Sequence, residues 1–308
     1  MSVAPRVSVI LPTYNRGALL ARSIASVLTQ SYRDFELLVV DDASDDGTAE
    51  VLAGIADPRL QVLRQPQRRG AAQARNRGIR AARGALIAFQ DSDDEWLVWK
   101  LEQQVALLDA SPPDVGWIGG TYLVEARGHV HTVRAPALIA GRDYEGDLLI
   151  GEPFVTPTWL VRREVLEAAG LFDEQMPCLE DWDLVFKLAA RCRFRAVEDH
   201  ILLRHGSADG LYANVGKRIQ GLEVMLRRHR ERWLLQPPRY ARWCAELSRL
   251  LAQSGDADRA RHWLRVARQH ERPPSARILT LSLADAIHPR LFLRLNRSRW
   301  SAPFRGAR

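Results

Sequence analysis

Two aspartates separated by one residue, Asp91 and Asp93, directly follow the short apolar run Ala85–Phe89. Carboxylates at positions i and i+2 of a loop can share a hard divalent cation, because such cations prefer oxygen ligands. A solvated acidic turn is the other interpretation of this Asp-Ser-Asp sequence. Its place at the end of an apolar run favours the metal site.

A second acidic segment, Asp41–Thr48, follows another apolar run. A calcium-binding EF-hand loop that began at Asp42 would need a glutamate at its twelfth position, where the sequence has Ala53, so we exclude that site. A carboxylate here could instead accept a hydrogen bond from a uracil-type N3–H group. Asp45 or Asp46 could also cap the helix that follows, and the two roles are compatible.

Two further sets of side chains could take part in chemistry. Glu180 and Asp181 precede a segment with helical periodicity. A carboxylate there can cap the helix, or it can act as a general base toward an attacking hydroxyl. The partial positive charge of a helix N-terminus favours its ionised form. His205 follows a late apolar run; a lone histidine is usually structural, but a neutral imidazole beside an aspartate pair could complete a metal shell.

Short apolar runs alternate with helical patterns and would position these residues. Four strands are expected at Val7–Leu11, Phe35–Val40, Leu60–Leu63 and Ala85–Phe89, and the first of them is expected to be buried. Helices are expected at Leu20–Leu28, which has one apolar face, and at Thr48–Ala56, Gly70–Ala82 and Trp99–Leu108. The alternation predicts a doubly wound α/β sheet of parallel strands, in which ligands bind beyond the carboxyl ends of the strands. Both acidic segments lie at such ends.

The rest of the chain changes character near residue 210. Before it, strands are expected at Val115–Ile118, Thr121–Val124, His129–Val133, Thr156–Val161 and Ala196–Leu203, with a helix at Arg163–Ala169. After it, amphipathic helices are expected at Ile219–Trp233, Tyr240–Ala252, Ala257–His270 and Ser275–Ile287. The second and third of these resemble one tetratricopeptide-like hairpin. We therefore predict an α/β domain over residues 1–210 and a basic α-helical region over residues 211–308.

Charge divides at the same place. Residues 1–200 hold 22 Lys and Arg against 29 Asp and Glu, a net charge of −7, and residues 201–308 hold 22 against 8, a net charge of +14. A dense basic run in the second part lies beside Trp233 and consists of Arg227, Arg228, Arg230 and Arg232. It is either a solvated helix face or a surface that docks on an anionic membrane leaflet. Membrane is the better hypothesis, and no nucleic-acid partner is expected.

Composition limits the class of protein. The chain has 308 residues, of which 46% are hydrophobic and 26% charged, which excludes disorder, collagen-like sequence and a disulfide scaffold. Three widely spaced cysteines give neither a disulfide framework nor a metal knuckle, and they fit a reducing cytosol. No signal peptide is expected, and no apolar stretch reaches the ~18 residues that span a bilayer. We predict a cytoplasmic protein whose membrane association, where present, is peripheral at the inner face.

Several catalytic motifs are absent from the sequence. It contains no GxxxxGK[ST] loop and no GxGxxG segment after a strand, which argues against P-loop NTPases and dinucleotide-binding enzymes. It also lacks a GxSxG elbow and an HExxH motif. The chemistry is therefore expected to depend on carboxylates and a metal.

Five segments together resemble the family 2 glycosyltransferases: Val7–Asn15, Leu38–Thr48, Ala74–Gly78, Phe89–Asp94 and Glu180–Asp183. They occur in the family's order within about residues 5–210. The resemblance implies a GT-A fold, which is a Rossmann-like mixed, mostly parallel sheet flanked by helices, here with an α-helical C-terminal appendage. It also implies inverting transfer of a sugar from a nucleotide sugar.

The resemblance implies roles for individual residues. The nucleotide sugar is expected to meet Pro12, Thr13, Tyr14, Asn15, Asp41, Asp42, Arg75, Asp91 and Ser92. A divalent metal, Mn²⁺ or Mg²⁺, is expected at Asp93, Asp91 and His205, with Asp93 the principal ligand. Asp181 matches the catalytic base. One departure from the family pattern is Arg69, where members often have asparagine.

The function implied is metal-assisted transfer from a UDP- or dTDP-sugar to a hydroxyl of a saccharide or lipid-linked acceptor, in the synthesis of cell-surface polysaccharide or glycan. A sugar nucleotidyltransferase is one alternative, but it would need a glycine-rich loop where Pro12–Gly17 has a single glycine. A non-catalytic basic scaffold or binding protein is another. The intact set of carboxylates disfavours it.

Overall fold

A computed structural model describes residues 4–126, 128–134, 155–205 and 214–287, except for residues 272 and 274, together with Leu295. The described residues fall into two compact units. The first holds residues 4–174 and 180–205 of the described chain, and the second holds Gln175–Leu179 and the described residues from Asn214 onward. The predicted domain boundary at residue 210 lies outside the described residues and remains a prediction.

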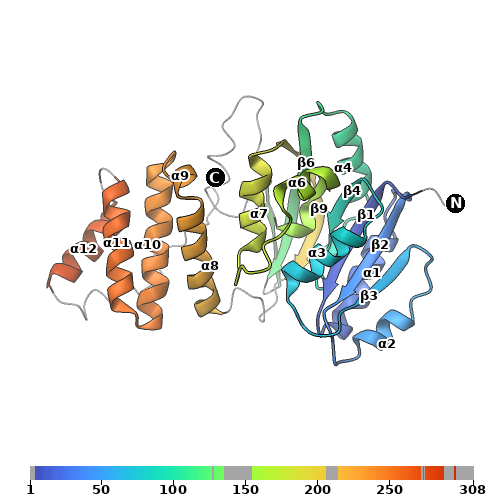
Figure 1. Cartoon of the computed structure of the whole chain (residues 1–308), viewed down its shortest axis with the longest axis horizontal. Coiled ribbons are helices and arrows are strands. Elements are labelled where there is room, and N and C mark those ends of the chain that lie inside the picture. The colour runs from blue at the N-terminus through green and yellow to red at the C-terminus, as the bar shows by residue number, and fades with distance from the viewer. Residues whose placement is uncertain are drawn as a thin grey trace. The chain divides into compact units, whose positions relative to one another are not determined.

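The first unit is built on a mixed sheet whose N-terminal part is parallel (Figure 1). Its parallel strands are β1 (Val7–Thr13), β2 (Phe35–Asp41), β3 (Leu60–Arg64) and β4 (Leu86–Phe89). They lie in the order β3-β2-β1-β4, so their carboxyl ends meet at one edge of the sheet. Every residue of β2 and β4 is buried, as expected for strands covered on both faces. The four predicted strands are confirmed.

The other half of the sheet continues from β4 in the order β8-β6-β9-β5, and β7 pairs with β6. These strands are β5 (Glu95–Trp96), β6 (Val115–Ala126), β7 (His129–Val133), β8 (Leu160–Arg162) and β9 (Arg193–His205). Strand β8 runs antiparallel to both β4 and β6, whereas β9 runs parallel to β6. The sheet is therefore mixed, as the GT-A resemblance implies, and the parallel arrangement that the alternation alone predicts holds for β1 to β4.

Three local expectations differ from the structure. The strands expected at Val115–Ile118 and Thr121–Val124 form one strand, because Gly119 and Gly120 continue the pairing with β9. The strand expected at Thr156–Val161 starts late, because Pro157 lies in a short 3₁₀ helix, Thr156–Thr158. The two-residue strand β5 was not predicted, since so short a strand leaves no periodic pattern.

Helices connect and cover these strands. In the first unit they are α1 (Gly17–Leu28), α2 (Thr48–Ala53), α3 (Ala71–Ala81), α4 (Lys100–Asp109), α6 (Arg163–Ala169) and α7 (Glu180–Ala189). Helix α3 lies against β1 and β2 (Figure 1). A Cβ atom on Gly78 would lie 2.5 Å from Cγ2 of Ile10, so a glycine lets α3 approach β1 closely. This approach places the helix beside the carboxyl ends of the strands.

A buried aromatic cluster supports the end of β4. The ring of Phe89, the last residue of that strand, meets Trp159 edge to face at 6.1 Å and Phe172 at 5.5 Å between centroids. Trp159 also packs against Trp117 at 5.3 Å. Such pairs favour edge-to-face geometry because of the ring quadrupoles. The acidic loop that begins after Phe89 therefore starts from a firmly packed strand end.

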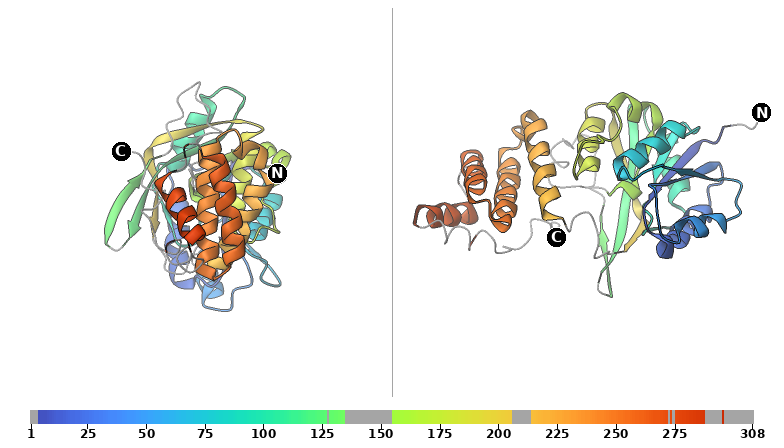
Figure 2. Two further views of the ribbon diagram at one scale, coloured as in Figure 1. Left: turned by 90° about the vertical axis from the view of Figure 1, so that its left-hand side faces the viewer. Right: turned by 60° about the horizontal axis from the view of Figure 1, so that its bottom comes forward.

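The second unit is helical (Figures 1 and 2). Its helices are α8 (Val215–Arg228), α9 (Arg230–Trp233), α10 (Pro237–Ser254), α11 (Ala257–His270) and α12 (Ala276–Ile287). Fully buried alanines on α11, such as Ala260, let it pack against α10, where Ser248 Oγ donates to the Ala260 carbonyl at 2.7 Å. The single helix expected over Ile219–Trp233 is interrupted at His229. No helix in the described part of the chain is long and apolar enough to cross a membrane.

Candidate active site

The loops after β1 and β2 are tied together by Asn15. Its side-chain Nδ2 donates to Asp45 Oδ1 at 2.7 Å, and its Oδ1 accepts from the Asp45 amide at 3.0 Å. Its own amide donates to Ser44 Oγ at 3.0 Å. Asn15 has φ of 50°, a left-handed conformation that asparagine tolerates better than most residues. The two loops therefore form one structure at the carboxyl edge of the sheet.

Asp46 lies just before the start of α2, whose N-cap residue is Gly47 and has no side-chain capping bond. Its Oδ1 accepts from the amide of Thr48 at 2.9 Å, and its Oδ2 accepts from the amide of Gly17 at 3.0 Å. The hydrogen bond from the Thr48 hydroxyl lowers the pKa of Asp46, and the backbone donors lower it further. Both oxygens of the Asp46 carboxylate therefore accept hydrogen bonds from within the protein.

The two aspartates at the end of β2 are buried. Asp41 Oδ1 accepts from the amide of Ser44 at 2.9 Å, and Arg64 Nε lies 3.5 Å from its Oδ2. Asp42 Oδ1 accepts from Gln65 Nε2 at 2.8 Å and from the Arg69 amide at 2.7 Å. Because Arg69 makes this contact through its backbone, the departure from asparagine at this position does not disturb it.

Four other predicted nucleotide contacts lie on the same edge. The guanidinium carbon of Arg68 is 4.0 Å from the centroid of the Tyr14 ring, a cation–π contact. Pro12 is half-buried, and Thr13 and Ser92 are buried. The Thr13 hydroxyl has no hydrogen-bond partner among the described residues although its oxygen is buried. A buried hydroxyl of this kind is suited to meet a ligand atom.

Arg75 connects the acidic loop after β4 with the start of α7. Its Nη2 lies 2.9 Å from Asp91 Oδ1, and its Nη1 lies 3.1 Å from Glu180 Oε1. Only 7% of Arg75 is exposed. Burial alone would lower the pKa of Arg75, but the charges of Asp91 and Glu180 outweigh burial and raise it. The structure therefore gives Arg75 two carboxylate partners, and its predicted nucleotide contact stays a prediction.

The next residue, Asn76, supports the same arrangement. Its Nδ2 donates to the carbonyl of Phe172 at 2.8 Å and to Glu174 Oε1 at 2.9 Å, and its Oδ1 accepts from the Phe172 amide at 3.1 Å. Consecutive residues of α3 thus hold both the acidic loop and the segment that follows α6. Asn76 and Glu180 each form hydrogen bonds to residues about 100 positions away in sequence. Local sequence patterns do not predict such contacts.

Asp181 lies in the first turn of α7, beside Glu180. The Oδ1 atom of Asp181 accepts a hydrogen bond from the backbone amide of Trp182 at 2.8 Å. Burial and the charge of Asp181 raise the pKa of Glu180, and Arg75 offsets part of that rise. Glu180 is thus occupied by Arg75, and Asp181 is the more exposed member of the pair.

The acidic loop brings the carboxyl groups of Asp91, Asp93 and Asp94 close together. Arg16 Nη2 lies 3.9 Å from Asp93 Oδ2, too far for a hydrogen bond. Burial and the neighbouring Asp91 raise the pKa of Asp93. Burial, Asp91 and Asp93 raise the pKa of Asp94 to about 8. Adjacent carboxylates that resist ionisation in this way would be stabilised by a bound cation.

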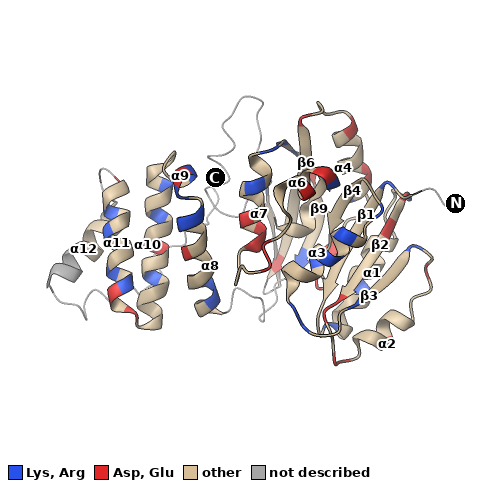
Figure 3. Ribbon diagram, in the orientation of Figure 1, with Lys and Arg blue, Asp and Glu red and all other residues tan. Residues whose placement is uncertain are grey.

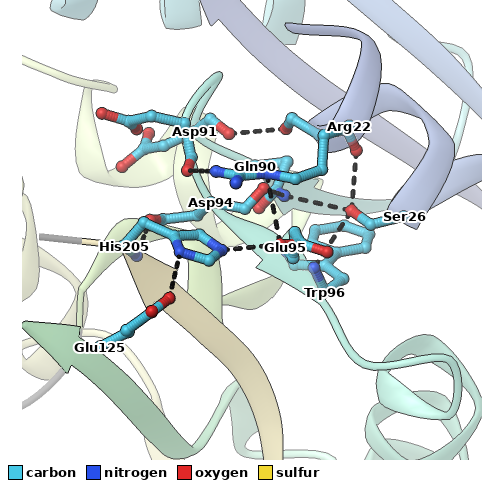
Figure 4. A network of polar contacts seen from close by, with 11 residues as sticks. Arg22, Ser26, Gln90, Asp91, Asp94, Glu95, Trp96, Glu125 and His205 are labelled. Carbon is cyan, nitrogen blue, oxygen red and sulfur yellow. Dashed lines mark hydrogen bonds and ion pairs between the residues drawn. The ribbon is translucent and has the colours of Figure 1, made fainter. Parts of the chain in front are cut away.

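His205 lies between two carboxylates that the sequence did not indicate (Figure 4). Its Nδ1 is 2.9 Å from Glu125 Oε2, and its Nε2 is 2.7 Å from Glu95 Oε1. Its backbone amide donates to Asp94 Oδ1 at 3.0 Å. Arg22 completes this network, with Nε 3.2 Å from Glu95 Oε1. Both ring nitrogens of the predicted metal ligand therefore have carboxylate partners.

The three predicted metal ligands differ in what they can offer. Asp93 has oxygen donors beside a second aspartate and a weak cationic partner, which suits a hard divalent cation. Asp91 already binds Arg75, and His205 binds Glu95 and Glu125. Within the described chain, no group of three or more His, Cys, Asp or Glu side chains is placed to hold a metal ion by itself. Among the described residues, a cation at Asp93 would therefore need ligands beyond a ready-made cluster of these side chains.

Comparison with known sequences gives a consistent family. Residues 8–170 match the family model described as glycosyl transferase family 2. Succinoglycan biosynthesis protein ExoO of Rhizobium meliloti is 30% identical over 243 residues, which cover 73% of this chain and 69% of that protein. The UDP-Glc:alpha-D-GlcNAc-diphosphoundecaprenol beta-1,3-glucosyltransferase WfgD of Escherichia coli is 44% identical over 102 residues. That match covers 33% of this chain and 40% of WfgD, so it spans about two fifths of that relative's length.

Solved structures share the fold. S. aureus TarS residues 1–349 in complex with UDP-GlcNAc gives a TM-score of 0.61 at 17% identity, covering 86% of this chain and 92% of that one. Mannosyltransferase PcManGT from Pyrobaculum calidifontis, in complex with GDP-Man and Mn²⁺, gives 0.57 at 22% identity, covering 96% and 85%. At these identities the likeness establishes the fold, and it confirms the predicted GT-A architecture.

Removing Arg75 should destabilise the first unit strongly. Arg75→Met leaves Asp91 and Glu180 without their shared cation, and breaking a buried ion pair in this way costs about 3–5 kcal/mol. Arg80→Met removes an exposed arginine of the same helix that pairs with Glu174, and such surface pairs contribute roughly 0–1 kcal/mol. Urea unfolding at pH 7 measures both changes. Equal losses in the two variants would show that Arg75 has no special structural role.

Proposed function

Because the chain belongs to glycosyl transferase family 2, we propose that it transfers a sugar from a nucleoside diphosphate sugar to an acceptor hydroxyl, with inversion at the anomeric carbon. One observation supports this most: Arg75 joins Asp91 of the acidic loop to Glu180, the neighbour of Asp181. Carboxylates suited to a cation and a carboxylate suited to proton removal thus belong to one ion-pair network. The donor in this proposal is a UDP- or dTDP-sugar.

The nucleotide would bind at the carboxyl edge of β1 and β2. The loop Pro12–Asn15 and the aspartates Asp41 and Asp42 meet there, joined by the hydrogen bonds between Asn15 and Asp45. The Tyr14 ring, which has the Arg68 guanidinium over it, could pack against a base or ribose. The buried Thr13 hydroxyl and the carboxylate of Asp42 offer polar contacts. Relatives with solved structures bind UDP-GlcNAc or GDP-Man, which supports a nucleotide-sugar donor.

A divalent cation, Mn²⁺ or Mg²⁺, would be held by Asp93 with Asp91 nearby. The crowding of carboxyl groups in the acidic loop supports this site, and PcManGT was solved with Mn²⁺. When bound, such a cation supplies Lewis-acid stabilisation of the charge that develops on a departing diphosphate. His205 would support this site indirectly. Its backbone amide donates to Asp94, and its ring lies between Glu95 and Glu125. Direct contact of His205 with the metal remains a prediction.

Asp181 would act as the general base. It accepts the proton of the acceptor hydroxyl while the hydroxyl oxygen forms a bond to the anomeric carbon. The bond from that carbon to the diphosphate oxygen breaks, and the nucleoside diphosphate leaves with the electron pair. Glu180 is less suited to this role because its carboxylate is buried against Arg75. A single displacement of this kind inverts the anomeric configuration.

The acceptor would be a saccharide or a lipid-linked saccharide in bacterial cell-surface polysaccharide or glycan synthesis. WfgD is named for a diphosphoundecaprenol-linked acceptor and ExoO for succinoglycan biosynthesis, which supports this class. Lys and Arg residues recur along the helices of the second unit (Figure 3). Arg227, at the end of α8, exposes 71% of its side chain. We propose that the basic run of Arg227, Arg228, Arg230 and Arg232 docks on the cytoplasmic face of an anionic membrane. No nucleic-acid partner is part of this proposal.

Asp181→Asn should abolish turnover and retain donor binding. The amide keeps the size of the side chain but cannot accept the proton, and removal of a general base costs roughly 10²–10⁴ in rate. Release of UDP or dTDP from a panel of sugar donors measures kcat, and calorimetry measures donor affinity. Asp258→Asn, the same change at a residue with 96% of its side chain exposed, is the control. Normal turnover in the Asp181 variant would remove Asp181 from the mechanism.

Asp93→Asn should remove the metal dependence of nucleotide binding. With Mn²⁺ present we expect UDP affinity to fall by roughly tenfold or more, because second-shell changes alone already reach that size. Without metal the variant and the wild type should bind alike. Calorimetric titration with and without EDTA measures this, and exposed Asp34→Asn serves as the control. Unchanged binding in Mn²⁺ would contradict a metal site at Asp93.

Replacing Arg227, Arg228 and Arg230 by glutamine should weaken binding to anionic vesicles. Each arginine near such a surface contributes about 1 kcal/mol, so three replacements should lower the partition coefficient by at least about tenfold. Flotation with vesicles that contain phosphatidylglycerol measures the effect. Exposed arginines of the first unit, Arg33, Arg191 and Arg195, provide a matched triple control. Binding that does not depend on anionic lipid would remove the membrane proposal.

A further inference from the structure

The carboxylate of Asp42 has most of its hydrogen-bonding capacity in use. Oδ1 accepts from Gln65 Nε2 at 2.8 Å and from the amide of Arg69 at 2.7 Å. Oδ2 accepts from the amide of Gly70 at 2.7 Å. An ionised carboxylate has about four acceptor positions, two on each oxygen. Oδ1 is therefore full, and Oδ2 can accept one more hydrogen bond.

Nucleobases differ in how many donors they present side by side. Uracil and thymine present one imino N–H between two carbonyl oxygens. Guanine presents an N1–H and an N2 amino group next to each other, and both need acceptors. Cytosine and adenine present a ring nitrogen acceptor beside an amino group, and a carboxylate repels that acceptor. A carboxylate with a single free position therefore matches uracil or thymine best.

We propose that Gln65 is a specificity-determining residue that restricts Asp42 to one further hydrogen bond and so selects uracil or thymine nucleotides over guanine nucleotides. This inference rests on the proposed function, in which Asp42 meets the base. Both side chains are nearly buried, with 4% of Asp42 and 6% of Gln65 exposed. Removing a bond between such groups is costly, so the restriction persists when a ligand binds.

The backbone around Gln65 explains why this side chain is held in place. The backbone amide of Gln65 donates to the backbone carbonyl of Asp41 at 2.8 Å. This bond continues the pairing of β3 with β2 by one residue. Gly70, whose φ of 94° favours glycine, aims its amide at Asp42. The other two donors to Asp42 are backbone groups, so among the described residues Gln65 is the one side chain that sets its free capacity.

The side-chain amide of Gln65 can also contact the base directly. Its nitrogen has two N–H groups, and one donates to Asp42. The second can donate to a carbonyl oxygen that flanks the pyrimidine imino group. Guanine also offers one such carbonyl, so this contact by itself does not discriminate, and the selection rests on the single free acceptor position of Asp42.

Binding of free nucleoside diphosphates to the full-length protein tests the inference. Calorimetry with Mn²⁺ compares UDP, dTDP, GDP, CDP and ADP. We expect UDP or dTDP to bind at least about tenfold more tightly than GDP, because the second donor of guanine stays unpaired. Preference for UDP would identify a ribonucleotide donor, and preference for dTDP a deoxyribonucleotide donor. Equal or tighter binding of GDP would overturn the inference.

Two variants separate the role of Gln65 from general effects on the loop. Gln65→Met keeps the length of the side chain and removes the amide, which frees one acceptor position on Asp42. The ratio of UDP to GDP affinity should fall by at least about fivefold, mainly through tighter GDP binding. Gln61→Met makes the same change on β3, where the amide faces Glu36 at 3.5 Å, and it should leave the ratio unchanged.

The outcomes distinguish this inference from the proposed function. A wild-type protein that binds no nucleoside diphosphate in Mn²⁺ would overturn both. A wild type that binds UDP and GDP equally, or a Gln65→Met variant with an unchanged ratio and intact UDP binding, would overturn the inference alone. A Gln65→Met variant that fails to fold leaves the wild-type panel as the deciding measurement.

Discussion

The arrangement of the site depends on the two ion pairs that the buried guanidinium of Arg75 forms. The guanidinium lies between Asp91, at the end of the parallel strands, and Glu180, at the start of α7. Without a cation there, two carboxylates from distant parts of the chain would repel each other in a medium of low dielectric constant. Helix α3 can present this cation because Gly78 lets it approach β1, and because Asn76 fixes the segment around Phe172. Packing, charge and the position of Asp181 are thus connected through one side chain.

Arg75 pairs with Asp91 and Glu180 but not with the two carboxylates that follow in the loop. Arg16 Nη2 lies 3.9 Å from Asp93 Oδ2, and burial together with the neighbouring aspartates raises the pKa of Asp94 to about 8. In the proposed function a divalent cation stabilises these crowded carboxylates in their ionised form and attracts a nucleoside diphosphate. The ring of His205 is held between Glu95 and Glu125 and ties neighbouring strands together, and its metal contact stays a prediction.

Much of this arrangement follows from the sequence, for identifiable reasons. Parallel strands bring their carboxyl ends to one edge, so the acidic residues after β2 and β4 could be expected to lie near each other. The partners of those residues could not be predicted. Glu95 lies on a two-residue strand without periodicity, and the pairing of Asn15 with Asp45 depends on the mutual fit of two loops. The split at His229 and the 3₁₀ turn at Pro157 reflect local geometry that overrides the apolar pattern.

In the proposed function these carboxylates support a single displacement at the anomeric carbon of a nucleotide sugar. Time-resolved proton NMR of donor hydrolysis tests it most directly, because water replaces the acceptor and the released sugar can be observed before it mutarotates. Hydrolysis of an α-linked UDP- or dTDP-sugar should first yield the β-anomer, at a rate that depends on Mn²⁺ or Mg²⁺. Initial release of the α-anomer would contradict the account, since retention requires a different arrangement of groups around the reacting carbon.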